Sequence, residues 1–161
     1  MFEHLDTREE LYNFKLGSAL KMERTVLDML ETNAEEAHDP QLAQLFRHHQ
    51  EETRQQIRNL EQAFHAFGWE VDDSPCPTIE AIEKEGKSNV KKTDDQLVDH
   101  VLLLGAAETE HHEIAVYEGL ITEARGLGRD DIVQLLRQNL EQEQHTLEEV
   151  KSATERVAVA A

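Results

Sequence analysis

Five glutamates occupy positions where the helical periodicity of the chain predicts apolar core residues: Glu23, Glu52, Glu110, Glu113 and Glu143. A carboxylate on the buried stripe of a helix costs several kcal/mol unless another group compensates its charge. Five of them at one level of a helical bundle would need cations. The spacing therefore predicts a site for two metal ions, and long helices must position it.

Cap residues indicate where the first two helices begin and end. Asp6 and Thr7 can each start a capping box, which predicts a first helix that continues to about residue 36. Asp39 followed by Pro40 predicts the start of a second helix, and Gly68 its end. These two helices are expected to form a hairpin.

A long crossover separates this hairpin from the second. Between Trp69 and Lys92, loop residues flank the segment TIEAIEKEG, which is interpreted as a short extra helix. Thr93 is predicted to cap a third long helix that ends before Gly126, and Asp130 is predicted to cap a fourth that runs to about residue 156.

The composition agrees with an all-α fold. Aromatic residues make up only 5% of the chain and Gly is infrequent, a balance that favours long helices over sandwiches or barrels. Two antiparallel hairpins joined by one long connection are typical of the ferritin-like four-helix bundle. We expect one such domain over residues 1–161, because this length supports a single core.

The glutamates should also share one depth in the bundle. The midpoint between Glu23 and Glu52 falls in the first proposed turn, and the midpoint between Glu113 and Glu143 falls in the second, on Gly128. Each glutamate then lies about 15 residues, or about 22 Å, from its loop. The alternative for any single glutamate is a position at the edge of its stripe, where the side chain reaches solvent. Glutamates at such edges would have no reason to lie at the same depth.

One imidazole joins these carboxylates, because His49 lies one turn from Glu52 on the same stripe. A carboxylate-rich set with one histidine favours two divalent ions, iron first and manganese next. The predicted metal ligands are Glu23, His49, Glu52, Glu110, Glu113 and Glu143. Gln56 and Tyr117, each one turn beyond a predicted ligand, are interpreted as hydrogen-bond partners of the ligand carboxylates, with ordinary packing as the alternative.

An apparent Glu-x-x-His motif, Glu108 to His111, is predicted to be a decoy. Both residues lie about 140–200° around the helix from the stripe of Glu110 and Glu113. His145 faces away from its own stripe for the same reason. The remaining histidines are expected at the surface or at stripe edges: His4, His38, His48, His65, His100 and His112.

Three segments resemble those of the bacterial YciE/YciF-type ferritin-like (DUF892-like) proteins: LFRHHQEETRQQIRNLEQAF, CPTIEAIEKEG and ETEHHEIAVYEGL. The resemblance extends from Leu16 to about Val150. It implies a ferritin-like bundle, a homodimer, a dinuclear metal site and a link to bacterial stress responses. The ligands that it carries over are His49, Glu52, Glu110 and Glu113, whereas Glu23 and Glu143 come from the depth argument.

Three functions remain open. The first is a stress protein whose dinuclear iron or manganese site reacts with oxygen or peroxide, as a ferroxidase, peroxidase or catalase. The alternative is a non-enzymatic helical bundle with a structural or vestigial metal site that assembles with partners during stress. Iron storage in a shell of many subunits is a third option.

The charge of the chain limits its partners. A formal net charge of −18 argues against nucleic acid and anionic membrane as partners, because phosphate contacts need clustered Lys and Arg. The acidic N-terminal segment lacks the pattern of a signal peptide, and Cys76 is the only cysteine. We therefore expect a cytoplasmic protein.

Overall fold

The computed structural model of the chain describes residues 4–160, and within that range every regular element is helical. The long helices are α1 (Arg8–Glu36), α2 (Pro40–Phe67), α4 (Val98–Gly126) and α5 (Asp130–Ala160), and the shorter elements are α3 (Pro77–Lys91) and the 3-10 turn η1 (Asp95–Leu97). The all-α prediction is confirmed. The predicted lack of a signal peptide rests partly on residues 1–3, which lie outside the described residues.

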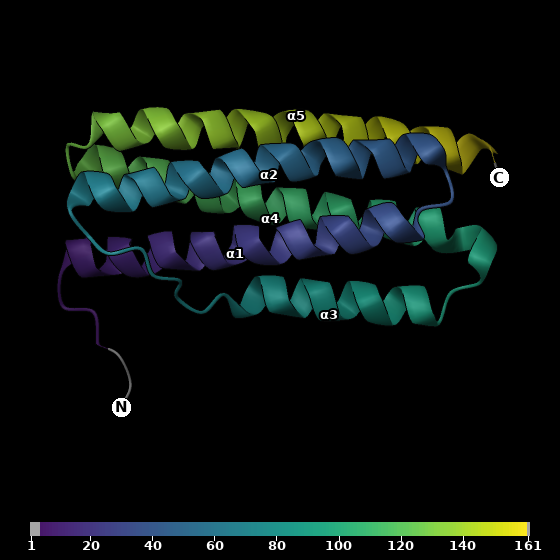
Figure 1. The fold of residues 1–161 in the computed structure, drawn as a ribbon, viewed down its shortest axis with the longest axis horizontal. Helices are drawn as coiled ribbons and strands as arrows, with labels where there is room; N and C mark the ends of the chain where they lie inside the picture. The colour runs from purple at the N-terminus through teal and green to yellow at the C-terminus, as the bar shows by residue number, and fades with distance from the viewer. Residues whose placement is uncertain (1–3, 161) are drawn as a thin grey trace.

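Four long helices run side by side along the long axis of the molecule (Figure 1). α1 packs against α2 and α4, and α5 packs against the same two helices, so that neighbours in the bundle are antiparallel. α3 lies outside this bundle, against α1 and α4. The crossover that contains α3 therefore joins two helical hairpins, as the sequence predicted.

Local chemistry explains most helix ends. The Thr7 side chain accepts a hydrogen bond from the backbone N–H of Glu10, and the Glu10 carboxylate accepts one in return, which completes a capping box. The Asp39 carboxylate accepts from the N–H of Gln41 at 2.8 Å. Gly68 ends α2 at φ 75°, a left-handed conformation that glycine adopts without steric cost.

Two predicted helix starts were wrong. Thr93 does not cap α4, because its hydroxyl donates to the carbonyl of Asn89 at 2.6 Å at the end of α3, which reaches Lys91. One 3-10 turn follows, and α4 begins only at Val98. Asp130 is the first residue of α5 rather than its cap, and its carboxylate lies in the first turn, where the helix dipole favours negative charge.

The crossover lies directly on α1. A Cβ atom at Gly17 would come within 2.7 Å of Ser74 Oγ and 2.9 Å of the carbonyl oxygen of Asp72, so only glycine fits there. The adjacent Ser18 hydroxyl donates to the carbonyl of Pro75 at 2.9 Å. These contacts hold the segment between α2 and α3 against the bundle.

All four long helices contribute to one apolar core, which includes Leu16, Phe46, Leu103 and Ile132. Polar side chains interrupt this core near the middle of the helices. No helix within residues 4–160 combines the length and the apolar character that a membrane span requires.

Candidate metal centre

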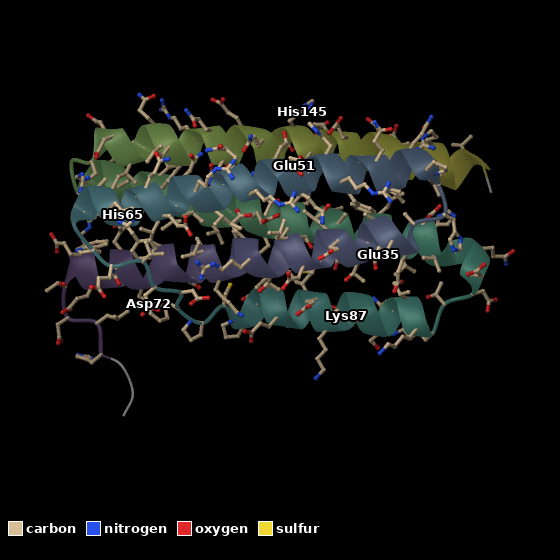
Figure 2. The ribbon with its side chains drawn as sticks, viewed as in Figure 1. Glu35, Glu51, His65, Asp72, Lys87 and His145 are labelled. Carbon is tan, nitrogen blue, oxygen red and sulfur yellow. The ribbon has the colours of Figure 1, made fainter. Side chains whose placement is uncertain are left out.

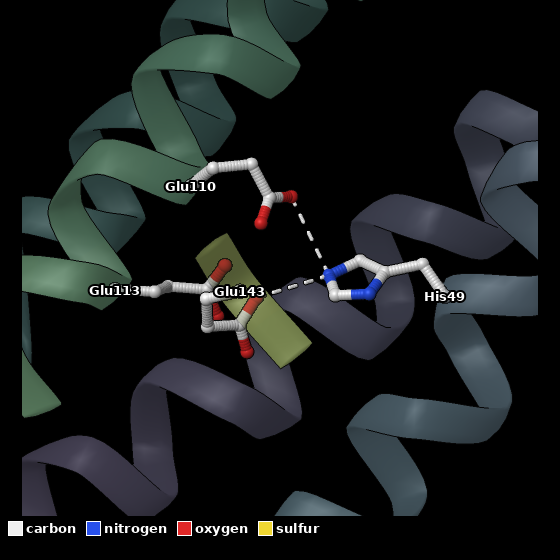
Figure 3. A group of neighbouring side chains, drawn as sticks. All are labelled: His49, Glu110, Glu113 and Glu143. Carbon is white, nitrogen blue, oxygen red and sulfur yellow. Dashed lines mark ion pairs between the residues drawn. The ribbon is translucent and has the colours of Figure 1, made fainter. Parts of the chain in front are cut away.

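Four buried side chains meet inside the bundle (Figure 3). His49 comes from α2, Glu110 and Glu113 from α4, and Glu143 from α5, and each offers a ligand atom within 4.8 Å of the others. Glu110 and Glu113 reach the same space because a separation of three residues places them on one helix face. None of the four is more than 2% exposed.

The imidazole of His49 lies between two sets of carboxylates. Its Nε2 atom is 3.4 Å from Glu110 Oε1 and 3.4 Å from Glu143 Oε2 (Figure 3). Its Nδ1 atom is 3.2 Å from Glu52 Oε2 on the other side. The ring therefore connects the enclosed carboxylates with Glu52.

Glu52 itself lies at the edge of the cluster. Its side chain is 16% exposed, and Thr146 on α5 donates a hydrogen bond to its Oε2 atom at 3.4 Å. The Thr146 hydroxyl is also 3.1 Å from His49 Nδ1. Glu52 is thus adjacent to the four-residue group without belonging to it. The role of Thr146 was not predicted, although its place one turn after Glu143 on the buried stripe was a usable signal.

Glu23 is fully buried on α1 and also lies outside the four-residue group. The hydroxyl of Tyr117 donates a short hydrogen bond to Glu23 Oε1, and Asn139 Nδ2 donates to the Tyr117 oxygen at 3.0 Å. Asn59 donates in turn to Asn139 Oδ1 at 2.7 Å. A buried hydrogen-bond network therefore holds Glu23 in place, and Asn59 and Asn139 are members that the sequence analysis did not single out.

The other residues of interest divide between core and surface. Gln56 is fully buried on α2, and neither atom of its side-chain amide has a hydrogen-bond partner among the described residues. The decoys Glu108, His111 and His145 are exposed. Two of the histidines expected at the surface or at stripe edges are half-buried, namely His100 and His112. The other four are exposed: His4, His38, His48 and His65.

Burial dominates the electrostatics of the enclosed acids. It raises the pKa of Glu113 well above the ordinary value, and the charge of Glu143 raises it further. The pKa of Glu110 and that of Glu23 are raised by the same two causes. Burial also raises the pKa of Glu143, although the nearby His49 opposes this. For Glu52 burial is outweighed by the hydrogen bond and charge of His49, so its pKa is lowered.

Among the described residues, His49 is the one basic side chain that faces the enclosed carboxylates. Several buried ligand atoms have no hydrogen-bond partner among residues 4–160: both carboxylate oxygens of Glu113 and of Glu143, one oxygen each of Glu23 and Glu110, and Nε2 of His49. Within residues 4–160, no Lys or Arg forms an ion pair with any of these acids. Buried polar atoms without partners are rare in folded proteins. The donor set of oxygens and one imidazole therefore fits metal ions of the iron and manganese class.

Comparisons with known proteins agree with this architecture. The family described as "Domain of unknown function (DUF892)" matches residues 7–161. Protein YciF of Escherichia coli strain K12 is 28% identical over 145 residues, which cover 89% of this chain and 87% of that protein.

Solved structures resemble the chain over most of its length. YcfI from Rhodopseudomonas palustris superposes with a TM-score of 0.90 at 31% identity, covering 94% of this chain and 97% of the other. The structure of the E. coli stress protein YciF has a TM-score of 0.90 at 25% identity, with coverage of 97% and 99%. A Xanthomonas campestris protein at 24% identity and a TM-score of 0.77, with coverage of 96% and 95%, shares the fold.

Proposed function

The chain belongs to the DUF892 family of YciE/YciF-type proteins, and on that premise we propose that its buried cluster binds two divalent metal ions, iron first and manganese next. The observation that carries this proposal is the set of unpartnered ligand atoms from His49, Glu110, Glu113 and Glu143, which lie within 4.8 Å of one another. Two divalent cations would offset the four negative charges that Glu110, Glu113, Glu143 and Glu23 bring into the core when ionised.

Each residue has a distinct task in this proposal. Glu113 and Glu143 would hold the metal with oxygens that have no hydrogen-bond partner among the described residues. His49 supplies Nε2, while its Nδ1 atom faces Glu52, which fixes the orientation of the ring. Tyr117 holds one oxygen of Glu23 and leaves the other free. The apolar core on either side excludes bulk water.

When bound, a pair of iron or manganese ions supplies redox chemistry toward oxygen or peroxide. We assign the protein to Fe(II) oxidation or peroxide consumption on this basis. The E. coli relative is described as a stress protein, and we extend a stress role to this chain. We also propose that it acts as a homodimer in the cytoplasm, without nucleic acid or membrane as partners.

Metal binding is tested by melting the apoprotein with and without Mn²⁺ or anaerobic Fe²⁺. At an ion concentration about 100 times the dissociation constant, binding adds about 2.7 kcal/mol, which raises the melting temperature by about 5–10 °C. Glu113→Ala should abolish this rise, whereas Glu108→Ala, a change on the exposed face of the same helix, should retain it. No shift in the native protein would overturn the proposal.

Catalysis is tested separately, by the rates of Fe²⁺ oxidation and peroxide consumption of the metal-loaded protein. The native protein should exceed Glu113→Ala in at least one of these rates. Equal rates, in a protein that binds metal, would favour the alternative of a non-enzymatic bundle with a structural metal site.

A further inference from the structure

Five glutamates lie in or beside the buried cluster, and within the described part of the chain Glu52 is the one that reaches the surface. Its side chain is 16% exposed, whereas those of Glu110 and Glu143 are 3% and 0% exposed. It lies where α2 packs against α5, because it accepts hydrogen bonds from His49 on its own helix and from Thr146 on α5. The buried cluster therefore comes closest to solvent at the seam between α2 and α5.

A surface groove lies along this seam. It has a volume of about 720 Å³, and its lining includes His48 from α2 with His145 and Glu149 from α5. Figure 2 shows His145 on α5 and Glu51 on α2, both near the middle of the molecule. The Nε2 atom of the exposed His48 is 3.8 Å from Glu52 Oε1. His48, which lines the groove, thus lies beside the outer oxygen of Glu52.

The inner oxygen of Glu52 faces the cluster. Glu52 Oε2 is 3.2 Å from His49 Nδ1, and His49 Nε2 is 3.4 Å from both Glu110 and Glu143 (Figure 3). His49 is 1% exposed, and its Nε2 atom has no hydrogen-bond partner in the part of the chain that the structure describes. Glu52 therefore lies between the groove-lining His48 and the buried His49, which borders the enclosed carboxylates.

We propose that divalent cations reach the cluster through the α2–α5 seam, with His48 as their outer contact and Glu52 as the carboxylate that passes them inward. This inference rests on the proposed metal binding and assigns Glu52 a role in uptake rather than as a permanent ligand. A negatively charged group at the mouth of a site raises the rate at which cations arrive. Hard divalent ions such as Mn²⁺ and Fe²⁺ match a carboxylate and imidazole route.

An uptake residue and a permanent ligand have different kinetic signatures. A residue that contacts the ion only in transit lowers the barrier in both directions, so its loss slows uptake and release alike and leaves the dissociation constant unchanged. The loss of a permanent ligand instead raises the dissociation constant, mainly through faster release. Rates and affinity measured on the same variant therefore separate the two roles.

The experiment follows Mn²⁺ uptake by the full-length apoprotein, using the loss of the free-ion EPR signal after rapid mixing and freezing, together with equilibrium titration. The deciding variant is Glu52→Gln, which keeps the shape of the side chain. His48→Ala tests the outer contact. His65→Ala is the matched control, since it removes an exposed histidine from the last turn of the same helix.

Gln at this position keeps an oxygen that can accept the hydrogen bond of His49 Nδ1, so the ligand ring stays oriented. We therefore expect Glu52→Gln to take up Mn²⁺ about tenfold more slowly, at a dissociation constant within threefold of the native value. His48→Ala should slow uptake without changing affinity, and His65→Ala should change neither. An unchanged uptake rate in Glu52→Gln, or a dissociation constant raised tenfold or more, would overturn the route. A native protein that binds no Mn²⁺ would instead overturn the proposed function, so the two failures are distinguishable.

Discussion

Glu113 combines full burial with a carboxylate that has no hydrogen-bond partner in the described part of the chain. Its pKa is raised in the folded apoprotein, first by burial and then by the charge of Glu143. The stability that Glu113 contributes through this raised pKa is therefore fully present below the ordinary pKa of 4.5. It is lost as the pH rises toward the pKa that Glu113 has in the folded protein.

Glu113→Gln removes this pH dependence without changing the size of the side chain. The apoprotein variant should be more stable than the native apoprotein above pH 4.5, by up to about 1.4 kcal/mol for each pH unit within the titration window. Urea unfolding between pH 5 and pH 8 measures the difference. Glu108→Gln should follow the native curve, and a constant offset for Glu113→Gln across this range would contradict the interpretation.

Tyr117 and Tyr12 form a second matched pair at the residue scale. Both are buried, but the Tyr117 hydroxyl bonds to Glu23 and Asn139, whereas the Tyr12 hydroxyl has no hydrogen-bond partner among residues 4–160. Tyr117→Phe should lower the free energy of unfolding of the apoprotein by about 1–3 kcal/mol, and Tyr12→Phe should leave it nearly unchanged. Equal effects in a denaturant titration would show that the network adds no stability.

At the scale of the helix, periodicity was sufficient to predict which faces are buried. The stripes and the equal distances from the turns predicted that acids from four helices lie together. The structure brings together His49 of α2, Glu110 and Glu113 of α4 and Glu143 of α5, and leaves Glu23 of α1 outside this group. Periodicity does not fix side-chain rotamers or the width of a seam. It could not indicate that Glu52 lies at a partly open edge, or that Tyr117 binds Glu23.

Helix starts were predictable where the capping side chain had no other hydrogen-bond partner close by. Thr7 and Asp39 cap as predicted because their side chains have free backbone N–H groups beside them. Thr93 has a competing acceptor, the carbonyl of Asn89, supplied by a longer α3 than the short helix predicted from sequence. Such competition depends on where the preceding helix ends, which the sequence around Thr93 does not reveal.

Gly17 tests how the crossover is attached to α1. A methyl group there would overlap Ser74 and Asp72, so Gly17→Ala should lower the free energy of unfolding by about 1–3 kcal/mol. Gly119→Ala is the matched control, since nothing lies within 4 Å of a Cβ atom at that site on α4. This control should stabilise the protein by about 0.5–1 kcal/mol, in line with helix propensity. Stabilisation by both changes would contradict the close packing of the crossover.

For the whole molecule, the subunit arrangement remains a prediction from the family resemblance. A homodimer should sediment with twice the chain mass of 18.5 kDa. Analytical ultracentrifugation of the metal-loaded protein at micromolar concentration measures this mass directly. A species of many subunits would contradict the dimer and favour the storage-shell alternative, whereas the chain mass alone would indicate a monomer.

The central claim is that the buried cluster of the bundle holds metal. Elemental analysis of the purified protein, combined with anomalous scattering from its crystals at the iron and manganese absorption edges, tests both the identity and the location of the ions. We predict two anomalous peaks bounded by His49, Glu110, Glu113 and Glu143. A protein that retains no metal after loading, with no anomalous peak among these four residues, would contradict the account.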